Sequence, residues 1–286
     1  MIERYKDKFP ISKLCDSLNV SRSGYYDWRN RGKSDRQKAN EKLLKHIKDV
    51  YQDSRMRYGS PRITEALKKQ DIQCSRPRVA RLMRKHGIRA VYGSRFKIQT
   101  TDSDGDFDYP PNLLKQDFSA DKPNQVWLSD ITYVKTTSGF MYLAVILDVC
   151  SNRIIGVSMK KSLSRHLVIS AFKDAVNRRE LDSEDNDLIF HSDRGSQYMS
   201  NDFRNLLNKY NIKQSMSSTG NCYDNAKMES FFGRLKEELI SLRKTSSVSK
   251  TRSEIFEYIE VYYNKKRLNS GIDYHTPVEY ERKYFA

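Results

Sequence analysis

Hydrophobic residues near the start of the chain recur at the spacing of short amphipathic helices. Residues 10–30 contain one such helix, a turn at Asn19 and Val20, and a second helix that Ser21 is suited to cap. The apolar face of the first helix consists of Ile11, Leu14, Cys15 and Leu18. This pattern predicts a helix-turn-helix, although an ordinary helical hairpin would give the same spacing. In a helix-turn-helix the second helix enters the major groove of DNA, and its contacts here would come from Arg22, Tyr25 and Arg29.

A second group of helices follows. Residues 38–53 carry an apolar stripe that residues 58–61 interrupt, and another helix extends over about 75–87. Ser75 is a candidate N-cap for that helix and Gly87 a candidate C-terminal stop. Its outer face is basic and is predicted to contact DNA phosphates through Arg76, Arg78, Arg81, Arg84 and Lys85. A basic face that is merely solvated is the competing interpretation.

The hydrophobic period changes to that of strands near residue 124. Three strands joined by short turns come first, and single strands then alternate with helices, which predicts an α/β domain with a mixed sheet. The predicted strands are 126–136, 140–149, 153–159, 188–191 and 212–216. The predicted helices cover about 164–179, 200–210 and 224–241.

Changes in composition divide the chain into five predicted parts. They are a helix-turn-helix at 1–34, a basic helical DNA-binding domain at 35–100, an acidic linker at 101–120, a catalytic α/β domain at 121–245 and a helical tail at 246–286. The linker residues Asp102, Asp104 and Asp106 are spaced like the start of a calcium loop. Leu113, however, stands where such a loop needs its glutamate, so a calcium site is not predicted.

The positive charge is confined to the first third of the chain. Residues 1–100 hold 26 Lys and Arg against 10 Asp and Glu, whereas the remaining residues hold 26 of each. The whole net charge of +16 therefore belongs to the predicted DNA-binding part, which should attract a polyanion.

Cysteine spacing and hydropathy bound the environment of the protein. The four cysteines are widely spaced and share no metal-binding pattern with histidines, so reduced thiols are expected and a zinc site is not. No apolar run approaches the roughly 18–20 residues of a membrane span, and no targeting segment is apparent. The expected location is the bacterial cytoplasm, in association with the nucleoid.

Three carboxylates give the α/β domain its candidate chemistry. Asp130 lies within the first predicted strand, Asp193 follows the fourth, and Glu229 lies on the last helix with 35 residues separating it from Asp193. Asn225 and Lys236 are four residues before and seven after Glu229, so they share its helical face. Carboxylate oxygens are the ligands that Mg²⁺ prefers, and two Mg²⁺ ions about 3.5–4 Å apart promote in-line phosphoryl transfer. The trio is therefore predicted to bind two Mg²⁺ ions, for which Mn²⁺ could substitute.

Each of these residues also has a structural alternative. Asp130 could be an exposed strand residue, Asp193 a turn former beside Gly195, and Glu229 a partner for Lys227 or Arg234. Among neighbouring residues, Asp148 is a competing carboxylate and Asp224 a candidate helix cap. His191 and Arg194 could orient Asp193 or contact a phosphate, and Arg194 and Asn225 are counted among the DNA-binding candidates.

With these motifs the chain resembles the catalytic half of bacterial insertion-sequence transposases of the IS-three family. The motifs are Val20–Tyr26 with Trp28, Tyr58-Gly59, Arg62-Ile63, Arg78–Met83, Trp127 with Asp130–Tyr133, His191–Tyr198, and Met228–Phe232 with Leu235–Glu238. Tyr262–Asn264, Arg267 and Thr276-Pro277 extend the similarity into the tail, where Asp273 replaces a usual glycine and Leu268–Ser270 a usual histidine.

The resemblance implies an RNase H-like fold, also found in retroviral integrases: a mixed five-stranded sheet with flanking helices, preceded by all-α helix-turn-helix domains. It implies that Asp130, Asp193 and Glu229 are the metal-binding catalytic carboxylates and that Lys236 contacts the transposon end. The implied activity is Mg²⁺-dependent cleavage at the ends of the element and joining by the 3′-OH, through a circular intermediate. The implied partners are the terminal inverted repeats, target DNA and at least one further copy of the chain.

Two rival functions have discriminating features. A non-enzymatic DNA-binding repressor would not need the three carboxylates. A retroelement-type integrase would usually carry a His/Cys zinc domain, which residues 1–50 lack. A serine or tyrosine recombinase is disfavoured, since no nucleophile is paired with an Arg/His cluster. The family also joins an upstream heptad-rich segment by frameshifting, so whether residues 1–286 act alone is an open question at this point.

Overall fold

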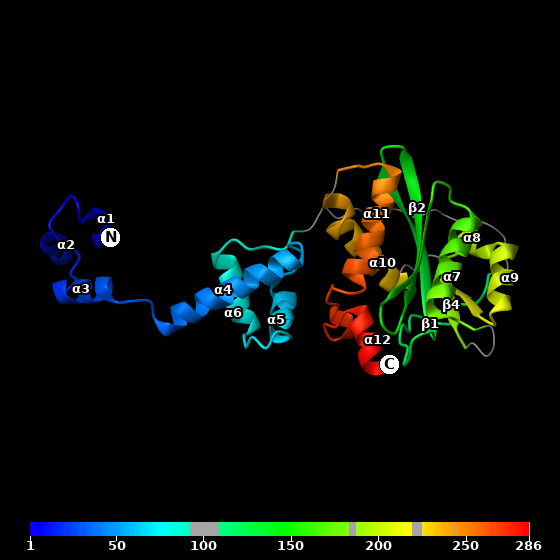
Figure 1. Ribbon diagram of the computed structural model, residues 1–286, viewed down its shortest axis with the longest axis horizontal. Coiled ribbons are helices and arrows are strands. Elements are labelled where there is room, and N and C mark those ends of the chain that lie inside the picture. The colour runs from blue at the N-terminus through cyan, green and yellow to red at the C-terminus, as the bar shows by residue number, and fades with distance from the viewer. Residues whose placement is uncertain (92–108, 183–186, 219–224, 243, 286) are drawn as a thin grey trace.

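The structure is a computed structural model that describes residues 1–91, 109–182, 187–218, 225–242 and 244–285. In Figure 1 three small helices stand apart at the N-terminal end of the molecule, and a second helical group lies next to the sheet-containing part. The central sheet has helices on both faces (Figure 1). In the described ranges no helix has the length and apolar character needed to cross a bilayer.

The N-terminal helices are α1 (Ile2–Tyr5), α2 (Ile11–Ser17) and α3 (Arg22–Asn30). The turn between α2 and α3 contains Asn19 at φ 54°, and the Ser21 hydroxyl accepts a hydrogen bond from the Gly24 amide at 3.0 Å. The predicted helix, turn and capped helix are therefore confirmed. Their core is small and consists of Ile2, Cys15 and Tyr25.

The second helical group comprises α4 (Asp35–Asp53), α5 (Ser60–Lys68) and α6 (Arg76–Lys85). Helix α4 begins three residues before its predicted start because Ser34 and Gln37 cap it reciprocally. Helix α6 ends as predicted before Gly87, whose φ of 67° favours glycine. The shared core of these helices consists of Leu43, Ile47, Val50, Tyr58, Ile63, Leu67, Val79, Leu82 and Met83.

The sheet has five strands in the order β3-β2-β1-β4-β5. They are β1 (Val126–Thr136), β2 (Gly139–Asp148), β3 (Ile154–Lys160), β4 (Ile189–Ser192) and β5 (Lys213–Met216). The first three strands pair antiparallel, while β4 runs parallel to both β1 and β5. The predicted mixed five-stranded sheet is thus confirmed, with β1 at its centre.

Helices cover both faces of this sheet. One face carries α7 (Arg165–Arg179), α8 (Ser196–Met199) and α9 (Asn201–Lys209), and the other carries α10 (Ala226–Glu238) and α11 (Val248–Glu257). Helix α7 lies so close to β3 that a Cβ on Gly156 would be 2.4 Å from the Ala171 carbonyl oxygen. Only glycine allows that approach. Helix α10 ends three residues earlier than predicted and is followed by a 3₁₀ turn, η2 (Ile240–Leu242).

After α11 the chain continues through a π-helical segment, η3 (Tyr258–Tyr263), a 3₁₀ turn, η4 (Ser270–Ile272), and the final helix α12 (Pro277–Phe285). The tyrosines of η3 belong to the core beneath α10, whereas Leu268 packs into the core of α4 to α6. The tail therefore connects the α10 side of the sheet with the helical group α4 to α6.

Asp273 has φ 50°, a left-handed conformation that favours glycine and that aspartate tolerates better than most residues.

The predicted boundaries of the five parts stay predictions. Residues 92–108 lie outside the described residues, and with them Asp102, Asp104 and Asp106. From Tyr109 the chain follows the edge of the sheet, where the Leu113 amide donates to Ser215 Oγ at 2.9 Å.

Candidate active site and nucleic-acid interface

Asp130 lies in the middle of the central strand. Alternate residues of β1 face the core under α10, and Asp130 shares the parity of Leu128 and Val134, which belong to that core. Its side chain is therefore directed toward the α10 face of the sheet. The Ile131 amide donates to its Oδ1 at 2.7 Å, so one carboxylate oxygen is held by the backbone. Asp130 is paired with Val145 of β2, which holds this position within the sheet.

Asp193 comes directly after the neighbouring parallel strand. The β1–β4 pairing ends at Leu128 and His191, and Asp130 and Asp193 each follow two residues beyond that last pair. The Gly195 amide donates to Asp193 Oδ1 at 3.0 Å. A Cβ on Gly195 would lie 3.0 Å from that same oxygen, so a larger residue would push the carboxylate aside. The turn after β4 thus positions the second acid.

The charge of Asp193 acts on Asp130. Burial raises the pKa of Asp130 well above its usual value, and the negative charges of Asp193 and then Glu229 raise it further, while Lys236 opposes them. Burial also raises the pKa of Asp193. Burial, together with the negative charges of Asp193 and Asp130, raises the pKa of Tyr198. The Tyr198 hydroxyl lies 2.9 Å from Ser129 Oγ. A divalent cation would relieve this repulsion, so the site suits a metal ion in both charge and ligand type.

Helix α10 supplies the third acid. It packs on the sheet through Met228, Phe231, Phe232 and Leu235 and leaves Glu229 exposed. Lys236 is partly buried, which lowers its pKa, although the Asp130 carboxylate acts in the opposite direction. Hard carboxylate oxygens fit Mg²⁺. Within the residues that the structure describes, however, no group of three or more His, Cys, Asp or Glu side chains is arranged to hold a metal ion.

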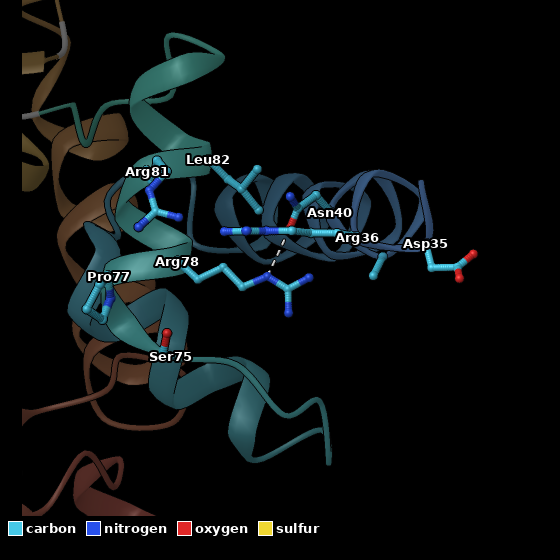
Figure 2. Close-up of a pocket in the computed structure, with 9 residues that line it drawn as sticks. Asp35, Arg36, Asn40, Ser75, Pro77, Arg78, Arg81 and Leu82 are labelled. Carbon is cyan, nitrogen blue, oxygen red and sulfur yellow. Dashed lines mark hydrogen bonds between the residues drawn. The ribbon is translucent and has the colours of Figure 1, made fainter. Parts of the chain in front are cut away.

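A basic recess lies between α4 and α6 (Figure 2). It has a volume of about 470 Å³, and three arginines line it: Arg36 from α4, and Arg78 and Arg81 from α6. Arg78 Nε donates to Asn40 Oδ1 at 2.9 Å, which fixes the direction of that guanidinium group. Helix α6 begins at this recess, and the Ser75 side chain makes no capping hydrogen bond there. Arginines beside a helix N-terminus create a positive potential suited to phosphate.

The other basic candidates divide into exposed and packed side chains. Arg22, Arg29, Arg76, Arg84 and Lys85 are exposed. Tyr25 instead is buried, and its hydroxyl donates to Glu3 Oε2 at 2.7 Å. Beside it on α3, Trp28 is 58% exposed, so the N-terminal helices present an aromatic as well as a basic surface.

Comparison with known families matches most of the chain. Residues 38–96 match the model of an HTH-like domain, and residues 120–222 match that of an integrase core domain. A second integrase core domain model matches residues 229–285, from α10 to the end of α12.

Two curated relatives match almost end to end. The 31 kDa protein of insertion element IS600 from Shigella sonnei is 39% identical over 271 residues, covering 95% of this chain and 98% of the relative. Transposase InsF for insertion sequence IS3A from Escherichia coli K12 is 37% identical over 287 residues, covering 100% and 98%. The chain belongs to the IS3 family of insertion-sequence transposases. It is therefore a transposase with an integrase catalytic core, and the repressor and retroelement-integrase alternatives are wrong.

Among solved structures, the catalytic core domain of HTLV-2 integrase in complex with magnesium (trimeric form) is 21% identical. It covers 56% of this chain and 98% of that chain, with a TM-score of 0.43.

Several neighbours of the transposase carboxylates have structural partners. Both ring nitrogens of the buried His191 lie within hydrogen-bond distance of serine hydroxyls, 2.8 Å from Ser215 and 3.2 Å from Ser217. Asp148 accepts hydrogen bonds from the amides of Asn124 and Cys150 at 2.8 and 3.0 Å. It is the last residue of β2, which lies on the other side of β1 from β4 and Asp193. These contacts favour structural roles for both residues.

Arg194 and Asn225 also lie within the fold. Arg194 Nε donates to the Ser217 carbonyl at 2.9 Å, and its guanidinium lies 4.6 Å from the centre of the Tyr109 ring. Asn225 is 8% exposed, and its Oδ1 has no hydrogen-bond partner among the described residues. Asp224 lies outside those residues. Lys227, considered as a partner of Glu229, donates instead to the Val149 carbonyl at 2.8 Å.

Sequence reasoning missed two features. The first is the recess arrangement, because Arg36 and Asn40 precede the apolar stripe and give no signal beyond their four-residue spacing. The second is a buried ion pair between Glu238 of α10 and Arg267 of the tail. The pattern marked Arg267 only through the family resemblance and offered no partner for it.

Proposed function

We propose that this transposase cleaves and joins DNA at a Mg²⁺ site formed by Asp130, Asp193 and Glu229. The observation that supports this most is electrostatic: Asp193 and Glu229, both far from Asp130 in the sequence, raise the pKa of Asp130. Perturbed acids on rigid elements are typical of catalytic centres. Bound at these carboxylates, Mg²⁺ would lower the pKa of an attacking water and neutralise charge on the transferred phosphate.

The chain's own residues have distinct parts in the proposed reaction. Asp130 and Asp193 would provide two carboxylates held by the sheet. Helix α10 would bring Glu229 and the Lys236 ammonium to the same side of the sheet. Lys236 would contact a phosphate oxygen of the transposon end. Water forms a bond to phosphorus at that end, and the P–O3′ bond breaks in line. The departing oxygen takes a proton and becomes a free 3′-OH.

The same site would then perform the joining step. The 3′-OH forms a new bond to phosphorus of a second phosphodiester, and another 3′ oxygen leaves. The bond energy of a phosphodiester is conserved, so no covalent protein–DNA intermediate is needed. By the family resemblance, we infer that one end first attacks the same strand near the other end. A circular form of the element would follow and would then be inserted.

We infer that the basic helices bind the terminal repeats of the element. The recess of Arg36, Arg78 and Arg81 (Figure 2) is suited to a backbone phosphate. The exposed Arg76, Arg84 and Lys85 extend the positive surface along α6. Arg22 and Arg29 would contribute in the same way from α3. Tyr25, Arg194 and Asn225 have packed positions, so they would act mainly by holding this surface or the acidic site in shape. Because two ends must be brought together, at least two copies of the chain would act on DNA. The protein would therefore be found with the bacterial nucleoid.

The deciding experiment uses DNA that carries the ends of the element. Wild-type protein should nick it and join strands only when Mg²⁺ or Mn²⁺ is present, with product mapping to locate the new 3′ ends. Asp130→Ala, Asp193→Ala and Glu229→Ala should each lose cleavage and joining while retaining DNA binding. Retained strand transfer in any of the three would contradict the assignment.

A further inference from the structure

Two motifs of the sequence have no part in the proposed chemistry, yet they meet in the fold. Tyr58 lies in the HTH-like part, just before α5, and Arg267 lies in the tail. The Tyr58 hydroxyl accepts a hydrogen bond from the Leu268 amide at 2.7 Å and donates one to the Lys266 carbonyl at 3.0 Å. Tyr58 and Leu268 are 5% and 6% exposed. One phenol therefore holds both sides of Arg267 against the HTH-like part.

Arg267 itself points toward the catalytic core. Its Nε lies 3.1 and 3.0 Å from the two oxygens of Glu238, and its Nη2 lies 2.6 Å from Oε1. Both side chains are 1% exposed, and Glu238 also accepts the Tyr258 hydroxyl at 3.0 Å. A buried ion pair joined by several hydrogen bonds tolerates little displacement, because moving either partner leaves a buried charge unpaired.

Glu238 is the last residue of α10, the helix that carries Glu229 and Lys236. A helix is stiff along its axis, so a shift or rotation at its end reaches residues two to three turns away. Metal ligands and phosphate contacts need placement within about 0.5 Å. Residues 266–268, with Tyr58 on one side and Glu238 on the other, thus form a continuous chain of buried contacts from the HTH-like part to α10. We call these three tail residues the bridge.

We propose that the bridge couples DNA binding by the HTH-like part to the position of α10. Tyr58, Arg267 and Glu238 are then positioning residues, which place Glu229 and Lys236 when the transposon end is bound. This inference rests on the proposed function of Glu229. Exposed contacts cross the same junction, such as Lys69 with Glu279 at 2.8 Å on α12, but that pair makes no hydrogen bond to α10.

The test compares two DNA duplexes carrying the element's own end. The long one extends from the cleavage point across the region bound by the basic helices, and the short one keeps only the base pairs next to the cleavage point. In the wild type the long duplex should be cleaved faster at saturating DNA. Tyr58→Phe removes both bridge hydrogen bonds and keeps the ring, so it should lower the rate on the long duplex about tenfold. The rate on the short duplex and the Kd for the long one should stay within a factor of two.

The matched control is Glu279→Gln, which weakens the exposed junction pair and should leave the long-to-short ratio unchanged. If Tyr58→Phe slowed cleavage of both duplexes by the same factor, the residue would have a merely structural role and the coupling would be overturned. If Tyr58→Phe slowed cleavage of neither duplex, the coupling would be overturned as well. Failure of the proposed function would look different: the wild type would cleave neither duplex with Mg²⁺, or Asp130→Ala would still cleave.

Hydrogen exchange gives a second measurement that needs no cleavage. A duplex trimmed to the region bound by the basic helices should slow amide exchange in α10 of the wild type, because binding at one end of the bridge restrains the other. The same duplex should leave α10 exchange unchanged in Tyr58→Phe. Equal protection in both proteins, or none in the wild type, would overturn the proposal.

Discussion

The acidic centre of the sheet and the basic N-terminal helices use charge in opposite ways. At the centre, backbone amides hold the partly buried Asp130 and Asp193, and burial together with the charge of Asp193 raises the Asp130 pKa. In the helices, most of the candidate cations are exposed, and only Arg78 is fixed, by Asn40. Few charges in fixed places serve chemistry, whereas many charges on a surface serve attraction.

This difference predicts how each region responds to change. A site that depends on geometry fails when one group is removed, because the remaining groups cannot replace its contacts. A surface that depends on its summed charge loses a fraction of its affinity with each cation. The following experiments test that contrast, beginning with the largest expected effect.

Asp130→Asn or Asp193→Asn should reduce Mg²⁺-dependent cleavage at least about a thousandfold, since several kcal/mol of charge stabilisation would be lost. DNA affinity should change less than about twofold, because neither residue belongs to the basic surface. Single-turnover cleavage and a gel-shift titration on the same end DNA measure the two quantities. Activity within tenfold of wild type would remove the distinction between the regions at once.

Burial should also separate the two regions in stability. Arg267→Met leaves the Glu238 carboxylate buried without its cation and should lower the free energy of unfolding by about 3–5 kcal/mol. The matched control is Glu41→Gln, which removes an ion pair with Lys33 whose side chains are 62% and 56% exposed, and it should change stability little. Urea denaturation followed by tryptophan fluorescence and circular dichroism measures both. Equal losses would mean that burial does not decide the strength of these pairs.

The repulsion at the acidic centre should make the metal-free protein sensitive to pH. The folded-state pKa of Asp130 is raised above that of the unfolded chain, so the folded protein holds this proton more tightly. The resulting stability is present at low pH and is lost as pH rises through the folded-state pKa. Asp130→Asn cannot ionise, so without metal it should denature at a higher temperature than wild type at neutral pH.

That difference should shrink toward about pH 4, near the ordinary pKa of aspartate, where the wild-type carboxyl keeps its proton. Saturating Mg²⁺ should stabilise the wild type at neutral pH and leave Asp130→Asn nearly unchanged. Differential scanning calorimetry at several pH values measures both effects. A wild type that melts above the variant at neutral pH without metal would refute the assigned repulsion.

The smallest effects are expected on the basic surface. Arg36→Gln, Arg78→Gln and Arg81→Gln should each weaken DNA binding several-fold and lower the slope of log affinity against log salt by about one. Lys213→Gln, on the sheet edge, is the control and should leave the slope unchanged. Fluorescence anisotropy over a range of salt concentrations gives the slopes. An unchanged slope for all three arginine variants would exclude the recess as a phosphate site.

Local pattern was sufficient to predict nearly every element of the core. Strand β1 has the predicted bounds, and the mixed sheet is expected from three strands joined by short turns followed by strands that alternate with helices. Ser21 and Gly87 also behaved as expected, because they act through their own backbone neighbourhoods, whereas Ser75 precedes α6 without a side-chain capping hydrogen bond. These features depend on residues close together in the sequence, or on strands long enough to show their period.

Contacts between distant segments could not be predicted in this way. The sequence around Arg267 indicates no partner for its charge. The fold pairs it with Glu238, which is separated from it by 28 intervening residues. Likewise, Tyr25 and Arg194 read as surface candidates, and only tertiary packing shows their contacts with Glu3 and Ser217. The sequence indicated the three carboxylates but gave no sign of how α10 is held over the sheet.

The π-helical turn at Tyr258–Tyr263 constrains how this tail can change in length. Its wide hydrogen bonds, such as Asn264 N to the Ile259 carbonyl at 3.0 Å, accommodate a residue that an α-helix would not. Deleting one residue there would restore an ordinary helix and leave the segments on either side facing as they do now. Deleting one residue from α11, where no wide turn absorbs the change, would rotate everything downstream by roughly 100° and carry the Arg267 guanidinium away from its carboxylate. The π-helical turn is therefore the place in this segment where the loss of a single codon does the least damage.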